Sequence, residues 1–384
     1  MKPLFSTVTL VLAFSLVSGP PAHGGTDPVK LVRLSSGGLQ PQAVVQEDGV
    51  VHLVYLKGDP RACDVIYSRR EAGQTNFLRW WMVNSQPGSA IAVGTVRGAQ
   101  FALGRNNRVH VAWNGSDQTK PGGSPMLYAR MKEAGEGFEA QRNLMTASSH
   151  LDGGGSVAAD KRGNVYVIWH GHPTGGPPDE LHRAVFMAKS TDDGKTFSPE
   201  RRINPEETGA CGCCGLKAFV NEKGDLAILY RSAAASGGRD VTLLHSLDQA
   251  ATFQSQIVGA WQVTTCPMST MALGPAEGDS FLGMWETRGT VYYEAMHSFS
   301  AQEEPRTVLT GRSNQKHPVF ARNARGEYLM AWTEGTAWAK GGDLAWQVLG
   351  KGGSQIAKGR AEGVPVWGGV AAIAEPDGGF TVFY

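Results

Sequence analysis

Apolar and polar positions follow a unit that recurs along the whole chain. In each unit a polar turn containing Gly or Asn precedes an apolar-rich segment that ends in an aromatic residue. The stretch EDGVVHLVY, ending at Tyr55, is one example, and KRGNVYVIW, ending at Trp169, is another. The aromatic residues recur about every 50 residues, a period typical of repeat proteins. They are Tyr55, Trp113, Trp169, Tyr230, Trp285, Trp332 and Tyr384.

Each unit predicts a meander of three or four antiparallel strands. A short strand of small residues, such as LKAFVN, precedes the turn, and a third strand, such as AVFMAKS, follows a variable loop. Valine, isoleucine, tyrosine and tryptophan suit strands that are buried between stacked sheets. The chain is therefore predicted to be an all-β protein, a β-propeller with four-stranded antiparallel blades. The seventh repeat ends at Tyr384 without outer strands, so the segment VKLVRL near the N-terminus could complete it and close the ring.

A second signature follows the third strand of two units. Its pattern is S-x-D-x-G-x-T-aromatic, in which the Asp carboxylate accepts backbone N–H bonds within a tight hairpin and Gly takes a positive φ. The second copy has Ala250 in place of Gly. The positions are Ser190, Asp192, Gly194, Thr196 and Phe197 in one copy, and Ser246, Asp248, Thr252 and Phe253 in the other.

These repeats resemble the sialidase-like β-propeller superfamily, also called Asp-box or BNR-repeat proteins. The resemblance covers residues 25–384 and implies a single propeller domain. Sialidases usually have six blades, whereas seven inner repeats are present here, so six and seven blades both stay open. The resemblance implies little about activity, because Asp boxes are structural and one fold can carry many functions.

Composition and the N-terminus narrow the class of protein. Fifty glycines and 20 prolines suit many tight turns, and a net charge of +1 argues against nucleic acid as a partner. Residues 1–24 combine Lys2, an apolar run and the small-residue stretch SGPPAHGG, a pattern typical of a cleaved signal peptide. The apolar run is shorter than the ~20 residues of a spanning helix. We expect a secreted or periplasmic monomer with no membrane span.

Alternating strand direction predicts which residues share a face of the propeller. The starts of first and third strands and the ends of second strands lie on one face, and the Asp boxes lie on the other. Five cysteines map to the first face, with Cys63 expected in a loop between two strands. Loops after second strands add His170, His172, Arg231, Glu286 and Arg288. Ligand sites favour such a channel mouth, so we expect a glycan or another small ligand there.

The stretch ACGCCG, residues 210–215, allows two interpretations. In an oxidising compartment Cys214 or a neighbour could form a disulfide with Cys266, which would stabilise the fold by about 4 kcal/mol. Alternatively, thiolate, thioether and imidazole ligands suit copper(I) or zinc. The candidate metal ligands are Cys211, Cys213, Cys214, Cys266, Met268 and His317. The disulfide is the expected outcome, and a redox thiol is a further alternative.

The resemblance also implies which residues a sialidase of this superfamily would need. Family sialidases use an arginine cluster, a tyrosine nucleophile with a glutamate, and an acidic group. This chain lacks the arginine-containing RIP signature, and Tyr292 and Tyr293 are expected to be packing residues. The catalytic candidates are Arg231, Glu286 and Arg288, and the substrate-binding candidates are Arg97, His170, His172 and Arg231.

Three hypotheses for the function follow. The first is a carbohydrate-directed protein, either a glycan-binding module or a glycoside hydrolase that is not a true sialidase. The second is a metal-binding or redox propeller. The third is a scaffold for protein partners.

Overall fold

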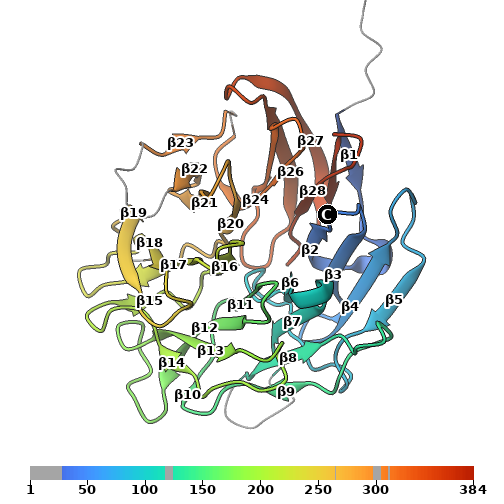
Figure 1. Ribbon diagram of the computed structural model, residues 1–384. Coiled ribbons are helices and arrows are strands. Elements are labelled where there is room, and N and C mark those ends of the chain that lie inside the picture. The colour runs from blue at the N-terminus through green and yellow to red at the C-terminus, as the bar shows by residue number, and fades with distance from the viewer. Residues whose placement is uncertain (1–27, 117–123, 264, 297–303, 310–311) are drawn as a thin grey trace, which may run out of the picture.

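The protein is a seven-bladed β-propeller. A computed structural model describes residues 28–116, 124–263, 265–296, 304–309 and 312–384. The described residues form seven β-sheets placed radially around a central axis (Figure 1). The only helices described are two 3-10 turns, η1 (Ser35–Gly37) and η2 (Arg105–Asn107). The number of blades, which the repeats left at six or seven, is therefore seven.

The first three blades and the strand that closes the ring occupy the N-terminal half of the chain. Their strands are β1 (Val29–Val32), β2 (Leu39–Val45), β3 (Val51–Asp59), β4 (Ala62–Arg70), β5 (Arg79–Met82), β6 (Gln100–Leu103), β7 (Val109–Asn114), β8 (Met126–Arg130), β9 (Arg142–Asn143), β10 (Ser148–Ser149), β11 (Ser156–Ala159), β12 (Val165–Pro173), β13 (Ala184–Ser190) and β14 (Arg201–Arg202).

The remaining blades follow in chain order. Their strands are β15 (Gly209–Ala210), β16 (Lys217–Val220), β17 (Leu226–Ala233), β18 (Val241–Ser246), β19 (Gln254–Gly259), β20 (Ala272–Pro275), β21 (Phe281–Thr287), β22 (Thr290–Met296), β23 (Arg306–Thr307), β24 (Gln315–Arg322), β25 (Tyr328–Glu334), β26 (Gly342–Leu349), β27 (Gln355–Val364), β28 (Ala371–Ala374) and β29 (Phe380–Phe383).

The ring closes through the strand near the N-terminus, as the sequence predicted. Strand β1 pairs in parallel with β29, with Val29 opposite Phe380 and Val32 opposite Phe383. The order of this sheet is β1-β29-β28, so it has three strands rather than the four predicted for every blade. The difference arises because the seventh repeat contributes two strands and β1 adds one. This seam joins the two ends of the repeat array without a covalent bond.

The recurring aromatic residues form the interior between blades. Trp113, Trp169, Trp285, Trp332 and Tyr230 are among the largest side chains that are fully buried. Each therefore packs against neighbouring strands rather than facing solvent. Truncation of such a tryptophan to alanine typically costs about 3–5 kcal/mol. The repeat thus encodes the inter-blade core.

The two turns that the sequence predicted as Asp boxes have the hydrogen bonds expected of their residues. Asp192 accepts from the Thr196 N–H through Oδ1 at 2.9 Å and from the Thr196 hydroxyl through Oδ2 at 2.7 Å. The Gly194 N–H donates to the Ser190 hydroxyl at 2.9 Å. The second turn repeats these contacts with Asp248 and Thr252, and Ala250 accepts a φ of 66° where the first copy has Gly194. The turns join third strands to fourth strands.

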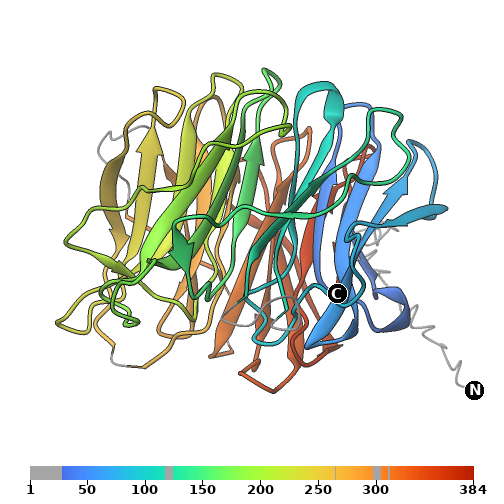
Figure 2. The ribbon, with the colours of Figure 1, turned by 90° about the horizontal axis from the view of Figure 1, so that it is seen from below.

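The blades define two faces of the molecule. The strands run along the axis of the propeller, so the connecting loops gather at its two ends (Figure 2). We call the face with the starts of β16, β20 and β24 the mouth face, and the face with the two Asp-box turns the hairpin face. No helix among the described residues is long and apolar enough to cross a membrane.

Several residues that were expected in loops lie within strands. Strands β12, β17 and β21 continue past their aromatic residues, so His170, Arg231 and Glu286 belong to them. The extension is stabilised by the short strands β10 and β15, which pair with the prolonged ends of β12 and β17. His172 is therefore also in β12, and Cys63 lies in β4 rather than in a loop.

Candidate functional site

The innermost strands of all seven blades enclose a central channel. The channel has a volume of about 1020 Å³ and is lined mainly by small and apolar residues, including Ala43, Val157, Ala218 and Ala372. At the mouth face its lining includes Thr270 and His317. The channel therefore opens beside the segments that precede β16 and β20.

Lys217 lies across this channel. Its Nζ donates to Gln42 Oε1 at 3.1 Å and to Gln100 Oε1 at 2.7 Å, which links the fourth blade to the first and second. Burial lowers the pKa of Lys217 to about 8. Sequence reasoning missed this residue because no motif marks a lysine whose partners lie on strands more than 100 residues away.

The cysteine loop, residues 211–216, connects β15 to β16 at the mouth face. The Cys211 N–H donates to the Arg231 carbonyl at 2.9 Å, and the Gly215 N–H donates to the Ser269 carbonyl at 2.9 Å. Between these anchors, the Cys214 N–H donates to the Cys211 carbonyl at 3.4 Å and closes a tight turn. The loop is thus fixed to the fourth blade at one end and to the fifth blade at the other.

Two glycines allow close packing between the cysteine loop and neighbouring segments of the chain. A Cβ on Gly212 would overlap the Arg183 guanidinium. A Cβ on Gly153, which has a φ of 70°, would lie 2.6 Å from the Cys214 carbonyl oxygen and 2.8 Å from His170 Nδ1. The spacing of glycine and cysteine in ACGCCG therefore reflects close packing against the third blade.

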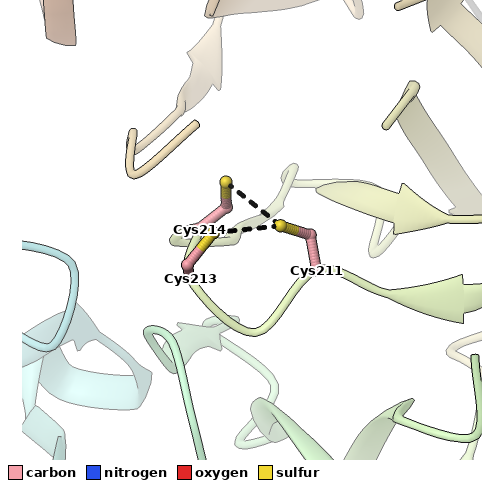
Figure 3. A group of neighbouring side chains, drawn as sticks. All are labelled: Cys211, Cys213 and Cys214. Carbon is pink, nitrogen blue, oxygen red and sulfur yellow. Dashed lines mark hydrogen bonds between the residues drawn. The ribbon is translucent and has the colours of Figure 1, made fainter. Parts of the chain in front are cut away.

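Three sulfur atoms of the loop point toward one another (Figure 3). Cys211 Sγ lies 3.3 Å from Cys213 Sγ and 3.6 Å from Cys214 Sγ. Both distances exceed the ~2.05 Å of a disulfide bond. All five cysteines are free thiols, and no disulfide is present among the described residues. The expected disulfide between the loop and Cys266 is therefore not found.

Cys266 and a glutamate extend this cluster. Potential ligand atoms of Glu180, Cys213 and Cys266 lie within 4.8 Å of one another, as do those of Cys211, Cys213 and Cys214. Glu180 precedes β13 and Cys266 precedes β20, so three blades contribute. The sequence predicted that Cys266 would lie near the loop. It gave no signal for Glu180, which belongs to no motif.

The three thiols of the loop differ in pKa. Burial opposes ionisation of Cys214, but hydrogen bonds from Cys211 and Cys213 and the nearby Arg231 guanidinium outweigh it and lower its pKa well below the usual value. The hydrogen bond with Cys213 lowers the pKa of Cys211, but the contact with Cys214 and burial outweigh it and raise that pKa. Contacts with Cys211 and Cys214, together with burial, raise the pKa of Cys213. The cluster thus favours one thiolate at Cys214.

Two buried histidines lie within electrostatic range of Cys214. Burial lowers the pKa of His170 to about 4 and that of His317 to about 3, and the Cys214 sulfur opposes both shifts. His317 Nδ1 is 3.3 Å from the Thr270 hydroxyl. Both imidazoles are therefore neutral at pH 7, the form that can bind a metal ion.

Two other polar or sulfur-containing residues of the mouth face have hydrogen bonds outside the cysteine cluster. His172 Nε2 is 2.8 Å from the Asp179 carbonyl oxygen. Met268 has a φ of 48°, its carbonyl accepts from Lys316, and no hydrogen bond joins its sulfur to the cysteines among the described residues. Of the predicted metal ligands, Cys211, Cys213 and Cys214 lie together, and Cys266 lies near Cys213.

The arginines and carboxylates proposed for sugar chemistry are paired within the protein. Arg231 is 0% exposed, donates to the carbonyls of Arg239 and Glu286, and lies over the Trp261 ring. Arg97 donates to Asp152 Oδ1 at 2.6 Å. A substrate carboxylate would have to displace these partners.

The remaining catalytic candidates lie in different environments. Glu286 is 2% exposed, and burial raises its pKa. Arg288 is exposed on the turn between β21 and β22 with a φ of 56°. Tyr292 stacks on Trp285 with ring centroids 6.4 Å apart, and Tyr293 packs against the core between the fifth and sixth blades, in agreement with the packing roles expected for both.

Comparison with known proteins defines the structural class. No protein-family profile matches the sequence, and no curated protein matches it. Among solved structures, a protein of unknown function from Dyadobacter fermentans DSM 18053 is 13% identical, with a TM-score of 0.54 over 86% of this chain and 96% of that one. The Hadza microbial sialidase Hz136 is 12% identical, with a TM-score of 0.52 over 82% and 69%.

A third solved structure extends the range of activities found on this fold. The α-L-arabinanase of Penicillium chrysogenum, complexed with arabinobiose, is 11% identical, with a TM-score of 0.53 over 83% of this chain and 95% of that one. The chain therefore shares its β-propeller fold with a sialidase and an arabinanase. Identities of this size establish the fold and leave the function to the site.

Proposed function

We propose that this protein binds a soft metal ion, copper(I) or zinc, through Cys211, Cys213 and Cys214 at the mouth of the channel. The observation that carries this proposal is the convergence of three free sulfurs within 4.8 Å of one another. Thiolate ligands favour these ions over magnesium or calcium. The rigid loop holds the three sulfurs together before an ion arrives, which reduces the entropic cost of binding.

The surroundings suit the charge of such a site. Three thiolates around copper(I) or zinc remain anionic, and an anionic group away from water needs compensating charge. The Arg231 guanidinium lies beside Cys214 and lowers the pKa of that thiol. His170 and His317 offer neutral imidazoles as further ligands or as hydrogen-bond donors that stabilise the thiolates.

The proposal also names the compartment in which the protein would bind its metal ion. Residues 1–24 have the pattern of an export signal, so the mature chain would begin near residue 25 and meet its ion in the periplasm or outside the cell. Free thiols in an oxidising space are protected from disulfide exchange when a metal ion occupies them.

Metal analysis of the mature protein tests the proposal. The protein is purified under reducing conditions without chelator, loaded separately with copper(I) and zinc, and assayed by elemental analysis and by competition with a chromophoric chelator. We expect at least one tightly bound ion, which is lost when Cys211, Cys213 and Cys214 are replaced together by Ser. Cys63→Ala is the matched control, because Cys63 is a buried thiol in the first blade and outside the cluster. Absence of bound metal from the reduced wild-type protein would contradict the proposal.

A carbohydrate ligand is a second candidate, favoured by the aromatic rim of the mouth. Trp338 is 46% exposed, and its carbonyl accepts from Trp367 Nε1 at 2.8 Å. Exposed tryptophans stack on apolar sugar faces, and two of the structural neighbours act on or bind glycans by their names. Glycan-array binding that is lost in Trp338→Ala and kept in the triple cysteine variant would support this role, and no binding to any glycan would contradict it.

A further inference from the structure

Cys213 belongs to two groups of potential metal ligands. One group is Cys211, Cys213 and Cys214, and the other is Glu180, Cys213 and Cys266. From these two overlapping groups we infer a second metal position, formed by Cys213, Cys266 and Glu180 on the solvent side of the first. This inference rests on the proposed function, because Cys213 would bridge the two ions.

The two positions differ in access to solvent. Cys211 and Cys214 are fully buried, whereas Cys213 is half-buried and Cys266 is exposed. Glu180 keeps 29% of its side-chain surface exposed. An ion that approaches from solvent therefore meets Cys266, Glu180 and Cys213 before it can reach the inner sulfurs.

The donor atoms also differ in chemistry. The inner position offers only sulfur, which suits copper(I) as well as zinc. The outer position combines two sulfurs with a carboxylate, and zinc accepts sulfur and carboxylate oxygen together. A thiolate sulfur has more than one lone pair, so Cys213 can bind an ion on each side. The outer position is thus expected to favour zinc.

Arginines hold the carboxylate of Glu180 in place. Arg239 pairs with Glu180 Oε2, and Arg183 Nη1 lies 3.8 Å from Oε1. Such pairing leaves lone pairs on Oε1 for a metal ion and fixes the orientation of the carboxylate, as outer partners of metal ligands commonly do. Arg183 also packs over Gly212 of the cysteine loop, so the same arginine orders ligands of both positions.

Zinc stoichiometry tests the inference. The reduced mature protein is titrated with zinc in the presence of a chromophoric competitor, and bound zinc is confirmed by elemental analysis after gel filtration. We expect two zinc ions per chain for the wild type, one for Cys266→Ala, and two for the control Cys63→Ala. Glu180→Gln should weaken only the outer ion, by about 10–100-fold. Thermal unfolding of each variant verifies that it is folded, and Cys266→Ala changes an exposed side chain.

Each outcome separates this inference from the proposed function. One zinc ion in the wild type, lost in the triple cysteine variant, would overturn the second position and leave the first. Two ions that persist in Cys266→Ala would also overturn it, because the outer position would then not require that thiol. No zinc or copper in the wild type would overturn both proposals.

Discussion

The two faces of the propeller differ in the polar residues that they contain. On the hairpin face, Asp192 satisfies the hydroxyl and backbone groups of its own turn, and Asp193 is paired with Arg108 at 2.6 Å. On the mouth face, the buried Nε atoms of Arg231 and Arg183 and Oε2 of Glu286 make no hydrogen bond among the described residues.

Buried polar atoms without a hydrogen bond among the described residues occur on both faces, and Asp193 Oδ1 is one on the hairpin face. Buried polar groups are normally paired, and each exception in a native protein calls for an explanation. On the hairpin face, the partners of Asp192 come from its own turn, whereas Asp193 pairs with Arg108 of the second blade. On the mouth face, unpaired groups from three blades surround a cluster of free thiols. The following predictions test the comparison, from the largest effect to the smallest.

Gly153→Ala should have the largest effect and should act on the mouth face. The substitution places a Cβ 2.6 Å from the Cys214 carbonyl oxygen at a residue with a φ of 70°. We expect the free energy of unfolding to fall by about 2 kcal/mol or more. We also expect metal affinity to fall. Denaturant unfolding and chelator competition measure the two effects. Gly175→Ala, at a φ of 78° with no atom near its Cβ, is the control for backbone strain alone. Equal metal affinities for both variants would contradict the assigned packing.

Asp192→Ala should have a smaller effect that is confined to the hairpin face. The loss of the hydrogen bonds to Thr196 and Ser190 should lower the free energy of unfolding by about 1 kcal/mol. Metal affinity should not change, because the turn lies at the opposite end of the blade. If chelator competition instead reported weaker metal binding in this folded variant, the independence of the two faces would be wrong.

The Asp192 turn should also give a defined pH dependence. Burial alone would raise the pKa of Asp192, but hydrogen bonds from Thr196 and Ser190 lower it to about 2 from an ordinary 3.8. The folded state therefore binds fewer protons than the unfolded state between these values. The contribution of Asp192 to stability should be complete above about pH 4 and should be lost as the pH falls toward 2. Unfolding free energies of wild type and Asp192→Asn, measured from pH 5 to pH 2.5, should converge at the acidic end. A constant difference across this range would count against the assignment.

The last prediction concerns the reactivity of Cys63, a buried thiol that lies outside the cysteine cluster. Burial raises the pKa of Cys63 to about 12, whereas the equally buried Cys214 has a lowered pKa. We expect a disulfide reagent to modify the exposed Cys266 first in the native protein and to reach Cys63 only after unfolding. Mass spectrometry of peptides after timed labelling gives the order. Early labelling of Cys63 would mean that the first blade opens locally.

The hydrophobic pattern alone predicted the blades. Apolar segments that lead to Trp113, Trp169 or Trp285 bury those side chains because a propeller sheet is covered on both faces. The same pattern predicted the mouth and hairpin faces, since strand direction must alternate in a meander. It also placed the cysteines on the mouth face, because their positions relative to the first strands are fixed along the chain.

The tertiary structure decided the rest. A repeat of about 50 residues does not state how many units close the ring, and the pairing of β1 with β29 depends on contacts between opposite ends of the chain. Sequence reasoning favoured a disulfide at the cysteine loop, but the structure has free thiols there and brings Glu180 to Cys213 from another blade. Lys217 likewise donates hydrogen bonds to Gln42 and Gln100 across the channel. Local patterns determine strands and turns because those depend on neighbours in sequence. A site assembled from three blades depends on the curvature of the ring, which no single repeat encodes.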